Sequence, residues 1–245
     1  MYRTLDPDKI IATLEALCRR IGERFPGAGL GKVAIDLLDV AREAQTRADK
    51  ISQPYRGLRI LIALMLASAA VLMLAFVWQY LKNKSTESTD LYAVLQGLDA
   101  GANLALVIGA AIWTTATLET RFKRRLALAD LHQLRSIIHV IDMHQLTKDP
   151  SAVLGQLPNT RSSPKRILAP IELMRYLDYC SEMLSLSSKV AAIYAQHLRD
   201  PVVISTVNEI EQLTTNLSNK IWQKISILER SDPEAVRTEI STIRG

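Results

Sequence analysis

The sequence has few of the residues that favour sheets and tight turns. Aromatic residues make up 5% of the 245 residues, and there are only 10 glycines and 9 prolines. Leucine, alanine and isoleucine dominate instead, which favours helix over sheet. No alternating strand pattern competes with the helical periods found along the chain. The composition therefore predicts an all-α protein.

Cysteine is scarce, and motifs for catalysis or cofactor binding are missing. Two cysteines, Cys18 and Cys180, cannot build the disulfide framework of a small secreted domain. The chain has no GxxxxGK[ST] or GxGxxG loop, no GxSxG elbow, no HExxH or ExxH, and no Cys/His cluster at zinc spacing. We therefore expect no cofactor, and a non-enzymatic protein is favoured over an enzyme.

Long apolar runs, by contrast, are present. Leu58 to Leu81 reads LRILIALMLASAAVLMLAFVWQYL, with about 20 residues after Arg59 that carry no charge, enough for one helical span. A second run covers Ala102 to Leu118. Its clean part, from Leu104, reaches only about 22 Å at 1.5 Å per residue, so the second helix must begin earlier. We expect a two-span transmembrane hairpin over 56–120, with spans near 59–81 and 99–119 and an outside loop 82–98.

The net charge of +5 is concentrated beside these spans. The basic residues that flank them are Arg56, Arg59, Arg121, Lys123, Arg124 and Arg125. Such an excess at both membrane ends is typical of cytoplasmic flanks, and it is also compatible with contact to anionic lipid. It predicts an integral membrane protein with both termini cytoplasmic, in a bacterial inner membrane by default, and no nucleic-acid partner. Both cysteines would then be reduced, and we expect them to be buried.

The flanking segments show helical periodicity. Residues 1–25 form one predicted helix, with Asp6 as N-cap and Pro7 in the first turn. Residues 29–52 carry a heptad seam of small side chains: Leu30, Ala34, Leu37, Ala41, Ala44, Ala48 and Ile51. That seam predicts either packing within the chain or self-association. Further helices are expected over 120–147, 170–199 and 201–230, with a short one starting at Asp232-Pro233-Glu234. Residues 1–55 and 121–245 together should form a cytoplasmic helical bundle.

Three of the four histidines lie between Asp130 and Pro150. His132, Arg135, His139 and Asp142 follow one another at steps of three, four and three, which predicts a polar stripe on one helix, with His144 on a different face. The stripe has three interpretations. It can pair with a carboxylate on another helix, or it can respond to pH because histidine titrates near neutrality. In the third, His139 and Asp142, with His132, bind a metal, and the remaining ligands come from Glu172, Asp178 or Glu182.

Polar residues also interrupt the second span. Asp99 and Asn103 are one helical turn apart. Asp99 can be the N-cap of the span after an interfacial segment Tyr92–Leu98, or the pair can line a polar path between subunits, since ionisable groups inside membranes are functional candidates. Small residues recur at the spacing that suits close helix contact, as Gly97/Gly101 and Ala105/Gly109.

These patterns predict a membrane-anchored interaction or sensor module that forms homo-oligomers and engages a cytoplasmic protein partner. The alternative is an oligomeric membrane pore or membrane-perturbing effector that uses Asp99 and Asn103. A third hypothesis is a metal-dependent hydrolase that uses the stripe from His132 to Asp142.

Overall fold

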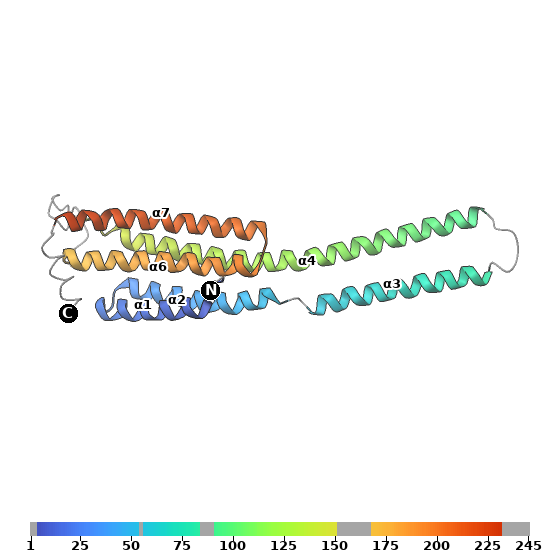
Figure 1. Cartoon of the computed structure of the whole chain (residues 1–245), viewed down its shortest axis with the longest axis horizontal. Coiled ribbons are helices and arrows are strands. Elements are labelled where there is room, and N and C mark those ends of the chain that lie inside the picture. The colour runs from blue at the N-terminus through green and yellow to red at the C-terminus, as the bar shows by residue number, and fades with distance from the viewer. Residues whose placement is uncertain (1–3, 54–55, 84–90, 151–167, 232–245) are drawn as a thin grey trace. The chain divides into compact units, whose positions relative to one another are not determined.

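A computed structural model gives the fold for residues 4–53, 56–83, 91–150 and 168–231, and these contain helices and no strand (Figure 1). The prediction of an all-α protein is confirmed. The helices, in chain order, are α1 Pro7–Arg24, α2 Gly29–Ser52, α3 Arg56–Asn83, α4 Leu91–Leu146, α6 Pro170–His197 and α7 Pro201–Ser231. The helix expected from Asp232 lies outside the described residues.

Helix α1 begins and ends at the residues that the sequence predicts. The Asp6 carboxylate accepts a hydrogen bond from the Asp8 backbone N–H at 3.1 Å, and Pro7 occupies the first turn, where no donor is needed. At the other end, the Phe25 N–H donates to the Ile21 carbonyl at 2.8 Å. Gly27 follows with φ of 76°, a left-handed conformation that suits glycine.

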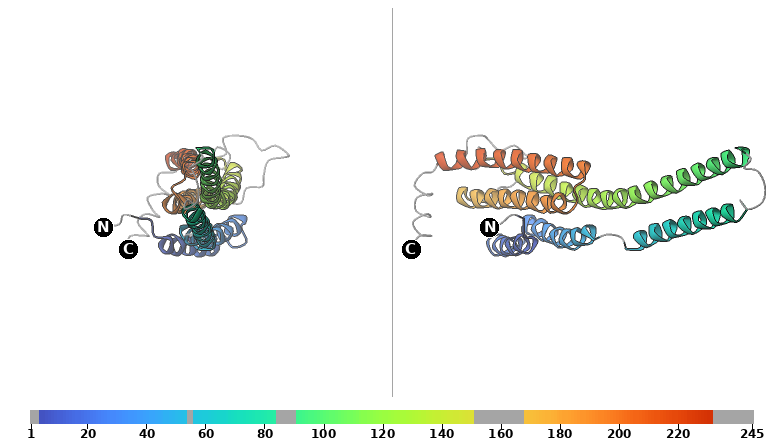
Figure 2. Two further views of the ribbon diagram at one scale, coloured as in Figure 1. Left: turned by 90° about the vertical axis from the view of Figure 1, so that its right-hand side faces the viewer. Right: turned by 45° about the vertical axis from the view of Figure 1, so that its right-hand side comes forward.

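Helix α4 is longer than the sequence analysis proposed. It runs without a break through 56 residues, from Leu91 to Leu146, as Figure 2 shows. Its continuation beyond Thr120 was predicted and is confirmed. Its start differs from the prediction, since the helix begins at Leu91, eight residues before Asp99. The prediction that Asp99 is the N-cap, after a separate interfacial segment Tyr92–Leu98, is therefore wrong.

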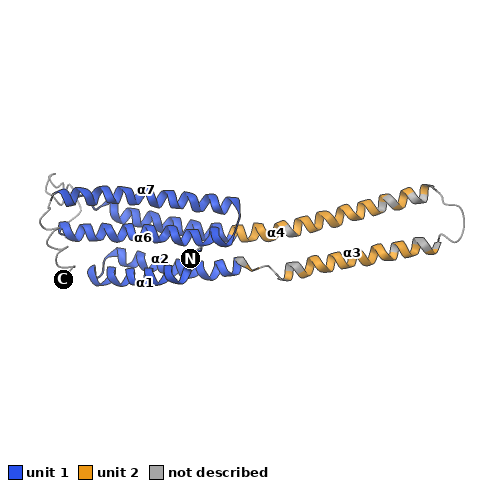
Figure 3. Ribbon diagram, viewed as in Figure 1, with its two compact units in different colours: residues 1–52, 126–245 blue, residues 53–125 orange. Residues whose placement is uncertain are grey.

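The chain divides into two units (Figure 3). The first combines residues 1–52 with 126–245, so segments on both sides of the apolar helices share one core. Helix α2 contacts α1 and α6, and α6 contacts α7. Every side chain of the predicted heptad seam on α2 is buried, with exposures of 0 to 4%. The seam therefore packs within the chain, and its interpretation as a self-association surface is wrong. Cys180 is buried as expected, whereas Cys18 is only half-buried.

The second unit, residues 53–125, contains the apolar helices. Within the described chain, two helices are long and apolar enough to cross a membrane: α3 through Ile60–Gln79, and α4 within Leu95–Leu146. None of the described residues in Ile60–Gln79 is buried. Large apolar side chains such as Leu64 and Leu74 are 63% and 69% exposed. An apolar surface of this extent is far larger than soluble monomers expose, which fits a lipid environment.

Candidate interaction site

The polar stripe predicted on α4 is divided between two faces of the helix. His132 and His139 are exposed, whereas Arg135 and Asp142 are half-buried. The Arg135 guanidinium lies 2.7 Å from the Glu209 carboxylate on α7. The interpretation that the stripe pairs with a carboxylate on another helix is therefore confirmed for Arg135. His144 lies on another face, as predicted.

Asp142 belongs to a polar chain that joins α4 to α7. The Gln145 side-chain amide donates to the Asp142 carboxylate at 2.6 Å. The ammonium of Lys224 on α7 in turn donates to the Gln145 side-chain oxygen at 2.7 Å and to its backbone carbonyl at 2.8 Å. Burial lowers the pKa of Lys224, and the nearby carboxylates of Asp149 and Asp142 oppose that shift. The side chains of Asp142, Gln145 and Lys224 therefore link α4 to α7. The Asp142 carboxylate is a hydrogen-bond acceptor in this link.

The predicted metal site does not acquire further ligands in the part of the chain that is described. No group of three His, Cys, Asp or Glu side chains there could hold a metal ion. The Glu182 carboxylate lies 2.7 Å from Arg20, and Glu172 accepts from the Ala169 N–H at the start of α6. Asp178 lies 3.8 Å from Arg175. The carboxylates proposed as additional ligands thus have other partners.

The outward face of α4 presents a second regular pattern. His132, Ser136, His139, Met143 and Leu146 are exposed at steps of four, three, four and three; we call this set the α4 outer seam. Met143 is 66% exposed and Leu146 is 61% exposed, with Val140 beside them at 40%. A seam with this spacing is the surface that one helix offers to another in coiled-coil packing. Sequence reasoning placed the two histidines in a polar stripe and missed their apolar neighbours.

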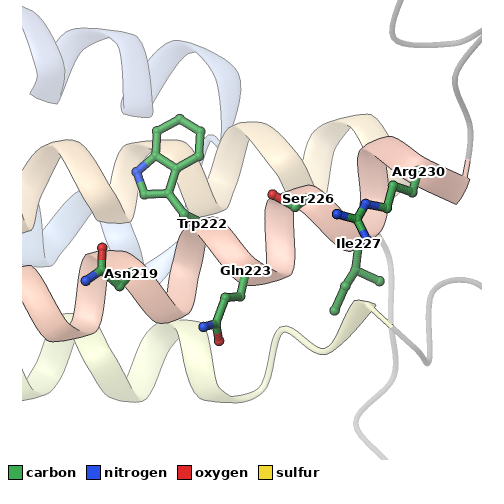
Figure 4. A pocket seen from close by; sticks show the side chains of 6 residues that line it. All are labelled: Asn219, Trp222, Gln223, Ser226, Ile227 and Arg230. Atoms are coloured by element: carbon green, nitrogen blue, oxygen red, sulfur yellow. The ribbon is translucent and has the colours of Figure 1, made fainter.

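The outward face of α7 carries a further surface. Its side chains line an open hollow of about 740 Å³, and the described lining residues are Asn219, Trp222, Gln223, Ser226, Ile227 and Arg230 (Figure 4). Trp222 is 51% exposed and Ile227 is 48% exposed. All six of these described residues belong to α7, and the hollow is open to solvent rather than enclosed. We call these six residues the α7 outer stripe.

A buried acid on the inner face of α4 escaped the sequence analysis. Asp130 is only 5% exposed and forms an ion pair with Arg47 of α2. The hydroxyl of Tyr194 on α6 donates to the other carboxylate oxygen of Asp130 at 2.8 Å. Burial and the Asp130 carboxylate together raise the pKa of Tyr194, which therefore stays a donor. The sequence did contain one indication of this role: Asp130 directly precedes Leu131, within the apolar pattern of Ala127, Leu131 and Leu134.

His144 is the second residue whose role the sequence did not indicate. Its Nδ1 lies 3.3 Å from the Tyr176 hydroxyl on α6, and Lys148 lies 5.0 Å from the centre of the Tyr176 ring. A side chain at Gly29 would begin 2.7 Å from the His144 ring, so glycine is what lets α2 approach there. Burial, and then the positive charge of Lys148, lower the pKa of His144. The His144 side chain thus lies where α2, α4 and α6 meet.

The polar residues of the second apolar helix are satisfied within that helix. The Asn103 amide donates to Asp99 at 3.5 Å, and both side chains are exposed. The hydroxyls of Thr114 and Thr115 donate to carbonyls one turn back, at 2.8 and 2.6 Å. At 1.5 Å per residue, Asp99 stands about 30 Å along the helix from Glu119, which is about the thickness of a hydrocarbon core.

The basic residues next to the spans differ in their environment. Lys123 is 8% exposed; its ammonium donates to the Gln53 carbonyl at 2.9 Å and lies 2.7 Å from Glu119. Arg121 and Arg125 are exposed, and Arg124 is half-buried. The side chains of Arg56 and Arg59 lie outside the described set. Lys123 thus stabilises the local structure, whereas the exposed arginines can face lipid headgroups.

Comparison of the chain with protein-family models, curated proteins and solved structures gives no match in any of the three.

Proposed function

We propose that this protein is a membrane-anchored, non-enzymatic interaction module whose helical bundle binds a protein partner through the α4 outer seam. The observation that carries the proposal is the exposure of Met143 and Leu146, at 66% and 61%, at the end of a seam with regular coiled-coil spacing. Exposed apolar side chains aligned in this way favour a contact with another helix.

The anchor in this proposal is the pair of apolar helices. The exposed apolar surface of α3 and the length of the apolar part of α4 support two spans. The basic residues that follow the second span, from Arg121 to Arg125, favour a cytoplasmic location for the bundle and for both termini. The partner would therefore be a cytoplasmic protein. A bacterial inner membrane remains the default location.

Homo-oligomerisation is a further part of the proposal and uses a different surface. Gly101 and Gly109 on α4 are exposed, and an added Cβ at either would meet no atom within 4 Å. Together with Ala105 they form a row of small residues along which another span can approach closely. The α2 seam is buried in the bundle, so it offers no surface to a second copy of the chain.

The pore alternative draws less support from the same helix. Asp99 is bonded to Asn103, and the threonine hydroxyls are bonded to their own backbone. A hydrolase that uses His132, His139 and Asp142 is likewise not favoured, because Asp142 is bonded to Gln145. We therefore retain the interaction module as the proposed function.

Site-specific photocrosslinking in membranes tests the proposal. A photoreactive amino acid at Met143 should yield a defined adduct with a second protein, and the Leu146→Glu substitution should abolish that adduct. Ile35 on α2 is a matched control, since it is an aliphatic helix residue that is 53% exposed in the same unit. Adducts of equal yield from positions 143 and 35, or none from 143, would contradict the proposal. The mass of the purified protein, by light scattering with the detergent subtracted, tests the oligomer separately.

A further inference from the structure

Two of the basic residues that follow the apolar part of α4 have no acidic partner. Lys123 is only 8% exposed, and its ammonium lies 2.7 Å from the Glu119 carboxylate and donates to the Gln53 carbonyl. Arg121 and Arg125, by contrast, are exposed, and no carboxylate among the described residues forms an ion pair with either of them. Their two positive charges are therefore available to an anion from outside the chain.

Arg121 and Arg125 are close enough to share one anion. They are four residues apart on the same helix, which places their Cβ atoms about 5–6 Å from each other. Like charges at this spacing repel and destabilise a helix, and an anion between the two guanidinium groups would remove that repulsion. Each guanidinium offers a planar fork of N–H donors that matches the oxygen atoms of a phosphate group. The pair therefore suits a single phosphate.

Apolar side chains occupy the rest of this helix face. At about 100° of rotation per residue, four side chains share an arc of about 100°, and the ion pair of Glu119 with Lys123 lies outside that arc. The four are Leu118, Arg121, Phe122 and Arg125. Leu118 is 52% exposed and Phe122 is 54% exposed. The face alternates apolar and cationic side chains, so it fits a ligand that has both a phosphate and a hydrocarbon chain.

A phospholipid fits this face better than free phosphate does. Free phosphate would leave Leu118 and Phe122 in water, whereas acyl chains would cover them. The position of the face also fits, because it follows directly on the apolar run that ends at Leu118, and headgroups lie at the ends of membrane spans. Two arginines favour an anionic lipid over a zwitterionic one, whose own amine offsets the charge of its phosphate.

We propose that Arg121 and Arg125 bind the phosphate of one anionic phospholipid whose acyl chains lie against Leu118 and Phe122. The site makes the protein selective for anionic lipid at the end of its second span. It depends on α4 crossing a membrane, which is the anchor of the proposed function. The α4 outer seam takes no part in it, so photocrosslinking from Met143 can succeed or fail independently of lipid binding.

Native mass spectrometry of the full-length protein in detergent tests the site. The probes are phosphatidylglycerol and phosphatidylcholine with identical acyl chains. One basic residue near an anionic lipid strengthens binding about fivefold. The unaltered protein should therefore bind its first phosphatidylglycerol about 30-fold more tightly than its first phosphatidylcholine. Arg121→Gln with Arg125→Gln should remove that preference and leave the binding of phosphatidylcholine unchanged.

The matched control replaces two other exposed arginines, Arg19 and Arg199, by glutamine. It changes the net charge by the same amount and should keep the preference for phosphatidylglycerol. Three results would overturn the proposal: no preference in the unaltered protein, no loss of preference in Arg121→Gln with Arg125→Gln, or an equal loss in the control.

Two further measurements test the contact with the acyl chains. Inorganic phosphate in excess should not displace phosphatidylglycerol, because it has no hydrocarbon to place against Leu118 and Phe122. Phe122→Ser should weaken the binding of both lipids and keep the preference for phosphatidylglycerol. If inorganic phosphate displaces the lipid, or if Phe122→Ser weakens the binding of neither lipid, the site holds a free anion and the proposal is wrong.

Discussion

The Asp130→Ala substitution should open the helical bundle far more often than the loss of one exposed acid would. Asp130 is 5% exposed and accepts from both Arg47 and Tyr194, so one carboxylate connects α2, α4 and α6. The substitution removes the acceptor from a tyrosine that is itself only 2% exposed. An unsatisfied buried hydroxyl has no water to replace the lost partner.

The size of the effect follows from the different exposure of the two partners. Leaving the Tyr194 hydroxyl unpaired costs about 1–3 kcal/mol. The side chain of Arg47 is 42% exposed, so its charge remains hydrated, and losing that pair costs about 1 kcal/mol or less. Together the change should lower the free energy of unfolding by about 1–4 kcal/mol. Asp130→Asn keeps an acceptor for Tyr194 and should cost about 1 kcal/mol, the difference between a charged and a neutral hydrogen bond.

The thiol of Cys180 offers an assay that needs no denaturant. Cys180 is fully buried, and burial raises its pKa to about 12, so it reacts only when the bundle opens. With Cys18 replaced by serine, the labelling rate of Cys180 reports the population of the open state. A loss of about 1–4 kcal/mol corresponds to labelling that is about 5 to 700 times faster, since each 1.4 kcal/mol is a factor of ten.

Asp39→Ala is the matched control, because Asp39 is an exposed acid on α2 that forms an ion pair with Arg42, one turn away, at 3.6 Å. It should change the labelling rate by a factor of about two at most. If Asp130→Ala labels no faster than this control, Asp130 does not hold the three helices together. If Asp130→Asn raises the labelling rate of Cys180 as much as Asp130→Ala does, the loss of stability comes mainly from the charge of Asp130 and not from its contact with Tyr194.

Three further predictions concern the packing and the protonation of His144 and the orientation of the apolar helices. Gly29→Ala should destabilise the bundle by about 1–3 kcal/mol, because the new methyl group overlaps His144. In a His144→Ala background the same substitution should be neutral or stabilising, and the labelling rate of Cys180 measures both effects. The lowered pKa of His144 means that the unfolded chain binds a proton first as pH falls below about 6.5; stability should therefore drop on acidification, and less so in His144→Gln. Lys82→Cys should react with an impermeant maleimide only from outside the cell, and Gln133→Cys only from inside, in intact and inverted vesicles.

Much of the bundle could be predicted because its signals are local. The start of α1 at Asp6-Pro7 and the limits of α2 at Gly29 and Ser52 depend on capping residues, breakers and period within one segment. The start of α4 could not be predicted in the same way. Residues 91–98 are apolar but contain Gln96 and Gly97, and a polar residue at 99 resembles an N-cap. Nothing local shows that the helix already exists at that point.

The candidate site was harder to predict, because a stripe along one helix does not reveal which of its edges faces the core. His132, Arg135, His139 and Asp142 do lie along one side of α4, yet Arg135 and Asp142 turn toward α7 while the histidines face outward. With 3.6 residues per turn, the two pairs differ by only about 60° of rotation around the helix axis. This difference is set by the partner side chains Glu209 and Lys224, which lie 74 and 79 residues farther along the chain than Arg135 and Gln145.

That division of the stripe determines what the histidines can do. His132 and His139 are exposed side chains of the α4 outer seam. A partner helix that packs on this seam would bury both beside Met143, where a polar side chain without a hydrogen-bond partner costs free energy. His132→Asp with His139→Asp, which places two carboxylates in the seam, should therefore lower the yield of the adduct at Met143. An unchanged yield would place the contact on Met143 and Leu146 alone.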